Sequence, residues 1–291
     1  MKKICFIILH YNTFNETCLC VDSILSLDGQ ECIEIIIIDN ASKNDSYQEL
    51  QKKYRHEKIL FLKNKENLGF SRANNYAYNY ARQLFSLEFV IFANNDICFL
   101  QKDFITRVRN EYNHSHFALL GPDVYTPRID QHVSPISRQM IMDKKQLRKK
   151  ILKSKIMLTF FPLYYLYWSY LNKHGKIKEL AYDVSLEYQE NVLLSGSCII
   201  CSPELLKDKT NIFYPETYFY YEEYILAYWC HLHQKKIVFQ PSLQIIHLGG
   251  IATKTISGNS KSKLKFILQN DASSAKIYLQ LLEGNLPNID F

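Results

Sequence analysis

The stretch "EFVIFANNDICFL", residues 88–100, ends a run of apolar residues with three consecutive polar ones. Phe89 to Ala93 form a short continuous apolar run, which is typical of a strand buried on both faces of a parallel sheet. The side chains of Asn94, Asn95 and Asp96 then need partners. They either close a turn, because Asn and Asp bond to nearby backbone, or line a ligand site, because open α/β sheets bind ligands at the carboxyl ends of their strands.

The first hundred residues predict alternating strands and helices. We expect strands at Lys3–Leu9, Ile33–Ile38, Ile59–Leu62 and Phe89–Ala93, and helices near Glu16–Leu27, Asp45–Tyr54 and Ser71–Leu84. Such alternation argues for a parallel sheet with helices on both faces. Polar residues follow all four strands, so these residues are expected at one edge of the sheet: Tyr11 and Asn12, Asp39 and Asn40, Asn67, and Asn94 to Asp96.

The bulk properties indicate a globular protein with an affinity for anions. A chain of 291 residues can bury a substantial core. The net charge of +6 suits phosphate ligands, nucleic acid or acidic lipid without choosing among them. The N-terminal "MKKICFIILHYN" lacks a small-residue cleavage site and predicts a first strand, not a signal peptide.

The eight cysteines are scattered along the chain, several of them in apolar strand-like runs. This usage is typical of reduced cytosolic thiols that serve as small hydrophobic side chains. Cys198 and Cys201 form a C-x-x-C pair in a strand-like segment. Because side chains alternate along a strand, positions three apart point to opposite faces, so a shared metal is not expected.

A second sheet-like part follows residue 190. One strand is expected in "NVLLSGSCIICS", residues 191–202, and one or two in "KKIVFQPSLQIIHLGG", residues 235–250. Between them, Ile225, Leu226, Trp229 and Leu232 recur at helical spacing, with two glutamates in the first turn. The tail from Lys261 to Leu282 predicts an amphipathic helix.

A basic segment and an aromatic segment lie side by side in the middle of the chain. Residues 144–155, "KKQLRKKILKSK", carry seven basic side chains, and residues 156–171, "IMLTFFPLYYLYWSYL", are aromatic and apolar. The second run is shorter than the roughly 20 residues that span a bilayer. The pair suits a membrane interface, where lysines meet anionic headgroups, and it equally suits a solvated basic helix packed on a core helix. No nucleic-acid-binding module accompanies the charge, and no nucleic acid partner is expected.

Seven motifs occur in a fixed order: "HYN", "IIIIDNAS", "NKENLGFSRANN", "FANND", "SGSCII", "YFYYEEYILAYW" and "IIHLGG". Together they resemble the family 2 glycosyltransferases with the GT-A fold over residues 3–253, most closely the bacterial capsular or cell-wall polysaccharide type. The resemblance implies an α/β, Rossmann-like fold with a mostly parallel central sheet flanked by helices. It also implies a helical membrane-proximal insertion, at about 140–178, and a C-terminal helix.

The resemblance also implies a domain division. Residues 1–256 would form the catalytic domain, with a nucleotide-sugar-binding half at 1–100 and an acceptor half at 101–256. Residues 257–291 would form a helical tail.

The donor nucleotide is the first ligand that the resemblance implies. Tyr11 matches the aromatic residue that contacts the base, for which a phenol ring offers a stacking face and a hydroxyl. Asp39 matches the acid that accepts the imide N–H of uracil or thymine; alternatively it caps a helix. Asn67 and Asn74 match polar residues that hold the nucleotide and diphosphate, and Arg72 is a candidate phosphate contact.

The implied metal is Mg²⁺ or Mn²⁺. "NND" stands where the family has D-x-D, so Asp96 would be the metal carboxylate, with Asn94 in place of the first acid and Asn95 between them. A hard divalent cation offsets the charge that develops on a leaving diphosphate. His247 matches the family histidine that joins this metal, although a lone histidine at a strand end is commonly structural.

The implied catalytic base is a carboxylate that takes the proton of the acceptor hydroxyl. Glu222-Glu223 stands in place of the family's Glu-Asp, so Glu223 falls on the base position with a side chain one methylene longer. Alternatively, both acids complement the positive end of the helix dipole. Ser195 and Gly196 would line the acceptor side.

These features predict an inverting, metal-dependent enzyme that moves a hexose or deoxyhexose from a UDP- or dTDP-sugar to a lipid-linked saccharide. It would be cytoplasmic and peripheral on the inner face of the bacterial cell membrane, against an anionic surface, and a homodimer is compatible with the sequence. The alternative is a non-catalytic scaffold that binds nucleotide sugars or glycans. A nucleotide-binding oxidoreductase would need a G-x-G-x-x-G after the first strand, which this sequence lacks.

Overall fold

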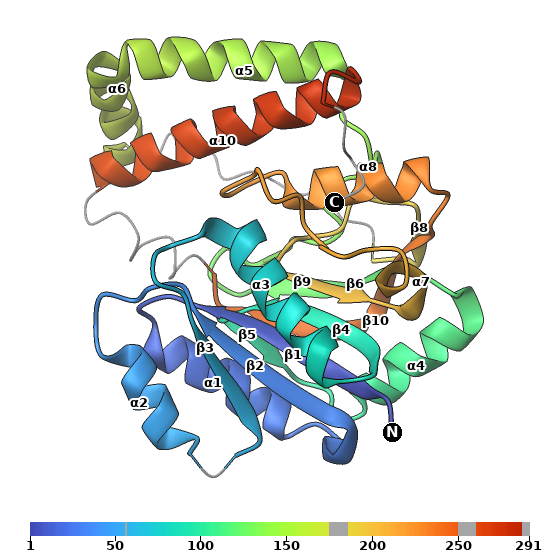
Figure 1. Cartoon of the computed structure of the whole chain (residues 1–291). Coiled ribbons are helices and arrows are strands. Elements are labelled where there is room, and N and C mark those ends of the chain that lie inside the picture. The colour runs from blue at the N-terminus through green and yellow to red at the C-terminus, as the bar shows by residue number, and fades with distance from the viewer. Residues whose placement is uncertain (56, 175–185, 250–259, 287–291) are drawn as a thin grey trace.

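The computed structural model describes residues 1–55, 57–174, 186–249 and 260–286. A ten-stranded sheet crosses this part of the chain, in the hydrogen-bonded order β3-β2-β1-β4-β9-β6-β10-β5, with β7 paired to β6 and β8 to β10. Helices cover both faces of the sheet (Figure 1). The predicted α/β class, with a central sheet flanked by helices, is confirmed.

The N-terminal half builds the parallel part of the sheet. Its order is β1 (Lys3–His10), α1 (Phe14–Leu25), the short 3₁₀ helix η1 (Gln30–Cys32), β2 (Ile33–Asp39), α2 (Ser46–Lys53), β3 (Ile59–Lys63), α3 (Gly69–Leu84) and β4 (Leu87–Asn94). The predicted strands and helices are all present, with ends shifted by a few residues. Strand β1 is parallel to β2 and β4, with His10 opposite Asp39 and Leu9 opposite Asn94. The carboxyl ends of these strands therefore meet at one edge.

Strand β4 is buried on both faces, as its apolar run predicts. Phe89, Ile91 and Ala93 join the core that includes the buried side of α1, whereas Val90 and Phe92 join the core beneath α3 and α8. The same alternation separates the two cysteines of β9 (Cys198–Cys201), since Cys198 lies in the first core and Cys201 in the second. The prediction that they point to opposite faces is confirmed, and all eight cysteines are free thiols.

The turn at Asn95 and Asp96 requires the sheet to curl. It leads directly from β4 into β5 (Ile97–Phe99), yet β5 pairs with β10 (Ile237–His247), and β9, β6 and β10 lie between β4 and β5 in the sheet. A link of two residues spans only about 7 Å. The far edge of the sheet must therefore bend back toward the end of β4, and this brings β10 close to the turn.

The second half of the chain adds strands of both directions. It contains α4 (Phe104–Ser115), β6 (Leu119–Thr126), β7 (Gln131–His132), β8 (Gln189–Glu190), β9, α7 (Pro203–Leu206), α8 (Glu222–Leu232) and β10. Strand β9 is antiparallel to both β4 and β6, whereas β10 is parallel to β6. The register of β10 shifts between Gln240 and Gln244, around Pro241, which has no N–H to donate to a sheet.

The prediction of one strand over residues 191–202 is wrong in its extent. Only the last part of this segment, β9, forms a strand ladder, and Leu193 makes an isolated bridge with Ser137. The hydroxyls of Ser195 and Ser197 lie 2.9 Å apart, and the Ser197 N–H donates to the Ser195 hydroxyl. Such local side-chain bonds compete with sheet pairing, so a loop precedes β9.

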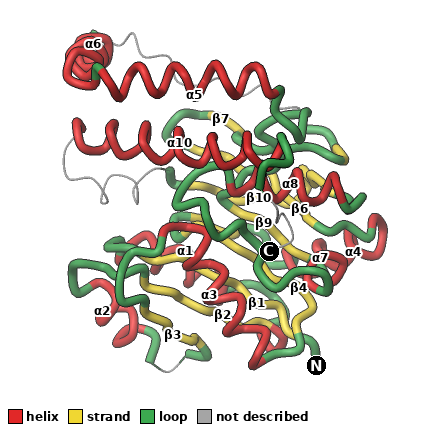
Figure 2. Tube along the Cα trace, turned by 45° about the horizontal axis from the view of Figure 1, so that its top comes forward, coloured by secondary structure: helices red, strands yellow, loops and turns green. Residues whose placement is uncertain are grey.

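Three helices form a further layer above α8 (Figures 1 and 2). They are α5 (Lys144–Thr159), α6 (Phe161–Lys173) and α10 (Ser260–Leu282). The predicted insertion therefore contains helices α5 and α6, and the predicted tail contains α10. Pro162 lies in the first turn of α6, where its missing N–H is not needed by the helix.

Helices α5 and α10 run antiparallel. Arg148 pairs with Glu283 at 2.6 Å near one end of the layer, and Lys265 lies over the Phe161 ring at the other. A small apolar core joins the layer to α8, and it includes Leu147, Ile225 and Tyr278. No helix in the described ranges is both long enough and apolar enough to cross a membrane.

Candidate active site

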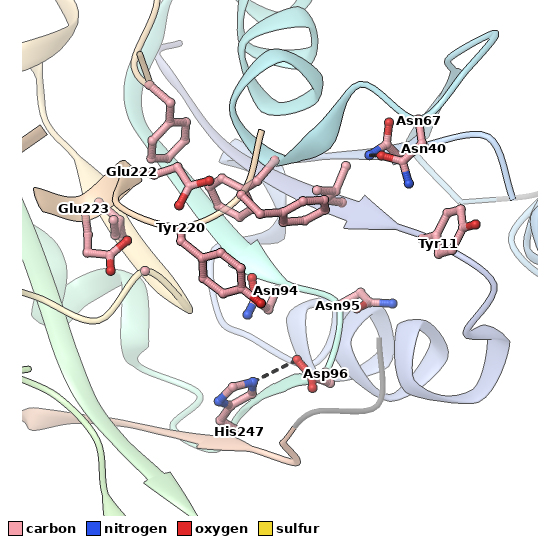
Figure 3. Close-up of a pocket in the computed structure, with 16 residues that line it drawn as sticks. Tyr11, Asn40, Asn67, Asn94, Asn95, Asp96, Tyr220, Glu222, Glu223 and His247 are labelled. Atoms are coloured by element: carbon pink, nitrogen blue, oxygen red, sulfur yellow. Dashed lines mark hydrogen bonds and ion pairs between the residues drawn. The ribbon is translucent and has the colours of Figure 1, made fainter. Parts of the chain in front are cut away.

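A cavity of about 310 Å³ opens at the carboxyl ends of the parallel strands. Figure 3 shows Tyr11, Asn40 and Asn67 at one end of it and Glu222 and Glu223 at the other. Nine residues that the sequence marked as site candidates line this cavity: Tyr11, Asn67, Asn94, Asn95, Asp96, Gly196, Glu222, Glu223 and His247. Residues more than 230 positions apart in the chain thus meet in one place.

Asn40 organises the end of the cavity near Tyr11. Its amide nitrogen donates to the Asn67 side-chain oxygen at 3.0 Å and to the Gly69 carbonyl at 3.1 Å. Its oxygen accepts from the Asn64 amide at 3.0 Å and from the Leu68 N–H at 2.9 Å. These bonds tie the loop before α3 to the end of β2, and they give the loop a defined polar surface toward the cavity.

Asp39 lies one residue away but does not line the cavity. Its carboxylate is fully buried, accepts the Ser42 N–H at 3.1 Å, and lies 3.9 Å from the Lys63 ammonium. The helix that follows, α2, begins at Ser46 with Asp45 as its N-cap residue. Asp39 therefore holds the turn after β2, and it does not cap the helix.

The Asn94 to Asp96 turn is bonded to α1 and also lines the cavity. The Asn95 amide donates to the hydroxyls of Thr13 and Thr17 at the start of α1, which is the turn-forming role. All three side chains also line the cavity. The turn is thus anchored on α1 while it presents polar groups to the cavity.

Asp96 and His247 come together across the curled sheet. The Asp96 Oδ1 and His247 Nε2 atoms lie 3.1 Å apart, as the dashed line in Figure 3 shows. Two features fix the pair: β5 and β10 place His247 opposite Ile97, and the Leu248 N–H donates to the Asp96 carbonyl at 2.9 Å. Asp96 is almost completely buried, so its carboxylate has little access to water except through the cavity.

This pair fits a divalent cation in its chemistry but supplies only part of a coordination sphere. A carboxylate oxygen and an imidazole nitrogen both suit Mn²⁺, and the carboxylate suits Mg²⁺. No cluster of three His, Cys, Asp or Glu side chains with metal-binding geometry occurs within the described ranges. A cation held here would therefore draw its remaining ligands from water or a bound phosphate.

Glu222 and Glu223 begin helix α8 at the opposite end of the cavity. Burial, together with the neighbouring charge of Glu223, raises the pKa of Glu222 to about 8. Its Oε1 atom is buried and has no hydrogen-bond partner among the described residues. Burial also raises the pKa of Glu223, but the positive charge of Lys150 acts in the opposite direction. The two neighbouring carboxyl groups therefore lie in different electrostatic surroundings, and only Glu223 is opposed by the charge of Lys150.

The backbone before α8 is strained. Tyr220 and Tyr221 both adopt left-handed conformations, with φ of 72° and 68°, which side chains with a Cβ rarely adopt. Such strain persists only where the surroundings enforce it, and it concentrates at functional sites. The turn directs the Tyr220 ring into the cavity, between the glutamates and the Asp96–His247 pair (Figure 3).

Gly196 approaches Glu223 closely. A Cβ atom built on Gly196 would lie 3.4 Å from Glu223 Oε2. The loop before β9 therefore leaves room beside this carboxylate, where a ligand can reach it.

Three other predicted site residues lie outside the cavity lining. Arg72 donates to the Pro215 carbonyl at 2.8 Å and pairs with Glu216 at 3.3 Å on the surface. The Asn74 amide donates to the Phe70 carbonyl within α3. The side chain of Ser195 is buried against Ser197. Each supports a segment of the site and does not face its interior.

The sequence interpretation assigned no site role to several residues that line the cavity, although it placed Asn40 at this edge of the sheet. They are Leu9, Asn40, Phe70, Ile199, Phe213, Phe219 and Tyr220. Asn40 carried a usable signal, because it directly follows strand β2. It lies at the carboxyl end of a strand, as Tyr11 and Asn94 to Asp96 also do. The other six residues carried none, because apolar and aromatic side chains are also typical of an ordinary protein core.

Comparison with known proteins identifies the family and the fold. Residues 5–170 match the model described as glycosyl transferase family 2. The fold is similar to the S. aureus TarS fragment 1–349, with a TM-score of 0.52 and 15% identity over 95% of this chain and 69% of that one. No curated protein matches the chain by sequence.

Two further solved structures share the fold. The mannosyltransferase PcManGT of Pyrobaculum calidifontis, in complex with GDP-Man and Mn2+, has a TM-score of 0.55 and 13% identity, over 96% of this chain and 70% of that one. GalNAc-T7 with UDP, GalNAc and Mn2+ has a TM-score of 0.55 and 12% identity, over 85% of this chain and 44% of that one. The family match covers more than half of the residues, and this chain belongs to glycosyltransferase family 2, with the GT-A fold.

Proposed function

We propose that the protein is an inverting, metal-dependent glycosyltransferase that moves a hexose or deoxyhexose from a UDP- or dTDP-sugar to a lipid-linked saccharide. The observation that carries this proposal is the arrangement of the cavity. It has a polar end at Tyr11, Asn40 and Asn67, a carboxylate–imidazole pair at its side, and two adjacent glutamates opposite. Related folds have been solved with UDP, with UDP-GlcNAc and with GDP-Man, which supports a nucleotide-sugar donor.

In this proposal the donor nucleotide lies against Tyr11, Asn40 and Asn67. The acceptor hydroxyl approaches the anomeric carbon from the side of Glu223, and its oxygen forms the new bond as the bond from that carbon to the phosphate oxygen breaks. The bonding electrons leave with the nucleoside diphosphate, and the proton passes to the Glu223 carboxylate, as general base catalysis requires. Attack from the face opposite the leaving group inverts the configuration of the anomeric carbon.

Asp96 and His247 would hold Mn²⁺ or Mg²⁺ in this proposal. When bound, the cation neutralises the charge on the diphosphate oxygens. Asn94, which stands where the family has its first acid, leaves the site with one carboxylate. We therefore expect weak metal affinity in the absence of nucleotide and stronger affinity with it, since phosphate oxygens complete the coordination.

The chemistry is tested by measuring donor hydrolysis and transfer with a panel of UDP- and dTDP-sugars plus Mn²⁺. Glu223→Gln should lower turnover at least about a hundredfold, since it removes the general base, while UDP binding is retained. In Asp96→Ala, addition of Mn²⁺ should no longer raise the activity. Activity that survives both substitutions would contradict the assignment, and tight UDP binding without transfer to any acceptor would favour the scaffold function.

A surface on helices α5 and α6 supports a place at an anionic membrane. On α6, the exposed side chains Leu163, Leu166, Tyr167 and Tyr170 follow helical spacing and form an apolar stripe. Leu152 and Ile156 on α5, and Phe160 at the junction of the two helices, are also exposed apolar side chains. Lysines 145, 149 and 153 lie on the same face of α5, and residues 144–174 contain no acidic side chain. We call these ten residues the interfacial surface.

An exposed apolar stripe beside lysines has the composition of a helix that lies in the bilayer interface. Each lysine near an anionic bilayer contributes about 1 kcal/mol. We propose that the interfacial surface holds the enzyme at the inner face of the bacterial cell membrane, where a lipid-linked acceptor is present.

Cosedimentation with lipid vesicles tests this surface. We expect binding to vesicles that contain phosphatidylglycerol and little binding to pure phosphatidylcholine. The double variant Leu163→Glu/Leu166→Glu should weaken binding at least about tenfold. Burial of each leucine side chain in the bilayer contributes about 1.5–3 kcal/mol to the binding free energy. The matched control Leu84→Glu/Leu100→Glu alters two exposed leucines elsewhere. Equal vesicle binding by the two double variants would exclude the interfacial surface as the membrane contact. A dimer that dissociates only in the α6 variant would instead show that this surface binds a second copy of the chain.

A further inference from the structure

Helix α5 reaches the catalytic end of the cavity through one lysine. The Lys150 ammonium donates to the Tyr221 hydroxyl at 2.8 Å and to Asp271 Oδ1 on α10 at 2.9 Å. It also lies 4.8 Å from the centre of the Tyr221 ring. Three elements from distant parts of the chain, α5, α8 and α10, therefore meet at one ammonium group.

Tyr221 directly precedes the two glutamates of the site. It is the N-cap residue of α8, it is almost completely buried, and it holds a left-handed backbone conformation. Its ring packs against Tyr224 and Tyr278, with centroids 5.1 and 5.8 Å away. The surrounding layer thus supplies the contacts that enforce a backbone conformation this residue would otherwise avoid.

Helix α10 holds the same turn from a second point. The Ser274 hydroxyl donates to the Phe219 carbonyl at 2.7 Å, one residue before the strained pair begins. Both α5 and α10 therefore bond to the segment that aims Glu222 and Glu223 into the cavity. The family match ends at residue 170, before α10 begins.

We propose that Lys150 is a positioning residue for the base Glu223: it fixes Tyr221 at the start of α8 and supplies the positive charge that this carboxylate faces. The proposal rests on the function proposed above. The groups around Glu223 are Lys150 of α5, Asp271 of α10, and Glu222, Tyr221 and Tyr224 of α8 and its cap. Lys150 lowers the pKa of Glu223, whereas burial and the Asp271 charge raise it.

Kinetics of purified Lys150→Met, measured without vesicles, test the positioning role. We expect kcat to fall roughly 10- to 100-fold, because small displacements of a catalytic group have effects of this size, and we expect the UDP dissociation constant to stay unchanged. The acidic limb of the kcat–pH profile should move to higher pH, since Glu223 loses its cationic neighbour. Lys150→Arg should restore most of the activity.

Three more variants separate charge from structure. Lys155→Met removes the same charge from an exposed position on α5 and should leave kcat and the profile unchanged. Asp271→Asn should move the acidic limb to lower pH, opposite to Lys150→Met, because the Asp271 charge raises the pKa of Glu223. Tyr221→Phe should lower kcat without moving the limb.

A carbon-13 NMR titration of the Glu223 carboxyl group, assigned with Glu223→Gln, checks the coupling without any turnover. The Glu223 pKa should be higher in Lys150→Met than in the unchanged protein. An unshifted pKa together with an unchanged kcat would overturn the positioning role, even in an active enzyme. If the unchanged protein shows no turnover with any donor but the Glu223 pKa still shifts in Lys150→Met, the proposed function is refuted. The electrostatic coupling between Lys150 and Glu223 would then still stand.

Discussion

At the scale of single residues, the site depends on two adjacent glutamates that lie in different environments. Glu222 is buried, its Oε1 atom has no hydrogen-bond partner in the described part of the chain, and its pKa is raised to about 8. Glu223 is opposed by the charge of Lys150. Environments that separate the pKa values of two carboxyl groups assign them different roles. A pKa of about 8 keeps Glu222 largely protonated at pH 7, and in the proposed function Glu223 is the base.

The first residue-scale prediction concerns Glu222→Gln. The folded-state pKa of Glu222 lies above its ordinary value, so its contribution to stability is fully present below about pH 4.5 and is lost as pH rises through about 8. The variant should therefore gain stability relative to the unchanged protein as pH rises from 5 to 8, by roughly 1.4 kcal/mol for each pH unit, because glutamine cannot ionise in the buried site. Urea unfolding at pH 5 and pH 8 measures the difference.

Because glutamine resembles protonated glutamic acid, Glu222→Gln should also keep most of its turnover at pH 7, unlike Glu223→Gln. The exposed Glu57→Gln is the control for a general charge effect. A Glu222→Gln variant that is as inactive as Glu223→Gln would show that Glu222 acts in its ionised form.

The second residue-scale prediction concerns Gly196→Ala. The new methyl group would lie 3.4 Å from Glu223 Oε2, in the space where an acceptor hydroxyl must approach. Stability should be unchanged or higher, by up to about 1 kcal/mol, since alanine restricts the unfolded chain. We expect transfer to a saccharide to fall more than donor hydrolysis, because water is smaller than the acceptor. Equal loss of the two activities would contradict an acceptor site beside Gly196.

At the scale of elements, His10 joins β1 to the two helices that follow it. Its Nδ1 atom lies 2.8 Å from the Thr17 hydroxyl of α1, and its Nε2 atom lies 2.8 Å from the Ser46 hydroxyl of α2. Burial lowers the pKa of His10 to about 4. The neutral ring thus fixes the helices on one side of the sheet relative to the strand end that carries Tyr11.

This junction predicts a pH dependence of stability. The folded-state pKa of His10 lies below its unfolded value of about 6.5, so its contribution is fully present above pH 6.5 and is lost as pH falls toward 4. The loss amounts to about 3 kcal/mol. His10→Asn should flatten this part of the stability–pH curve, measured by urea unfolding, whereas the exposed His231→Asn should not. Identical slopes in both variants would exclude His10 as the cause.

At the scale of the whole molecule, the curled sheet and the helical layer assemble the site from its two halves. The curl brings His247 to Asp96, and the α5–α10 layer supports the turn before α8. Tyr11, Asn40 and Asn67 come from the first half of the chain, and the two glutamates come from the second. A ligand that spans the cavity should therefore stabilise the entire fold.

Ligand linkage at this scale gives the next prediction. UDP with Mn²⁺ at a hundred times its dissociation constant should stabilise the protein by about 2.7 kcal/mol, which raises Tm by several degrees. Asp96→Ala should lose the increment that Mn²⁺ adds to UDP, whereas Asp103→Ala, at an exposed aspartate paired with Arg107, should keep it. An Mn²⁺ increment that persists in Asp96→Ala would place the metal elsewhere.

The sequence by itself determined the parallel strands of the first half and the polar residues at their carboxyl ends. It could do so because apolar runs and strand–helix alternation are local patterns, and parallel strands necessarily align their ends. Family likeness then pointed to Asp96, His247 and the two glutamates, and the structure brings all four to one cavity.

Which member of each neighbouring pair lines the cavity could be seen only in the folded chain. Asn40 lines the cavity whereas Asp39 does not, and Gly196 lines it whereas Ser195 does not. The path of the loop that follows or precedes each strand sets the direction of these side chains. The link from Lys150 to Tyr221 spans 71 residues and has no local pattern at all. Side chains that meet across such separations are brought together by packing between layers, and packing is a property of the folded chain alone.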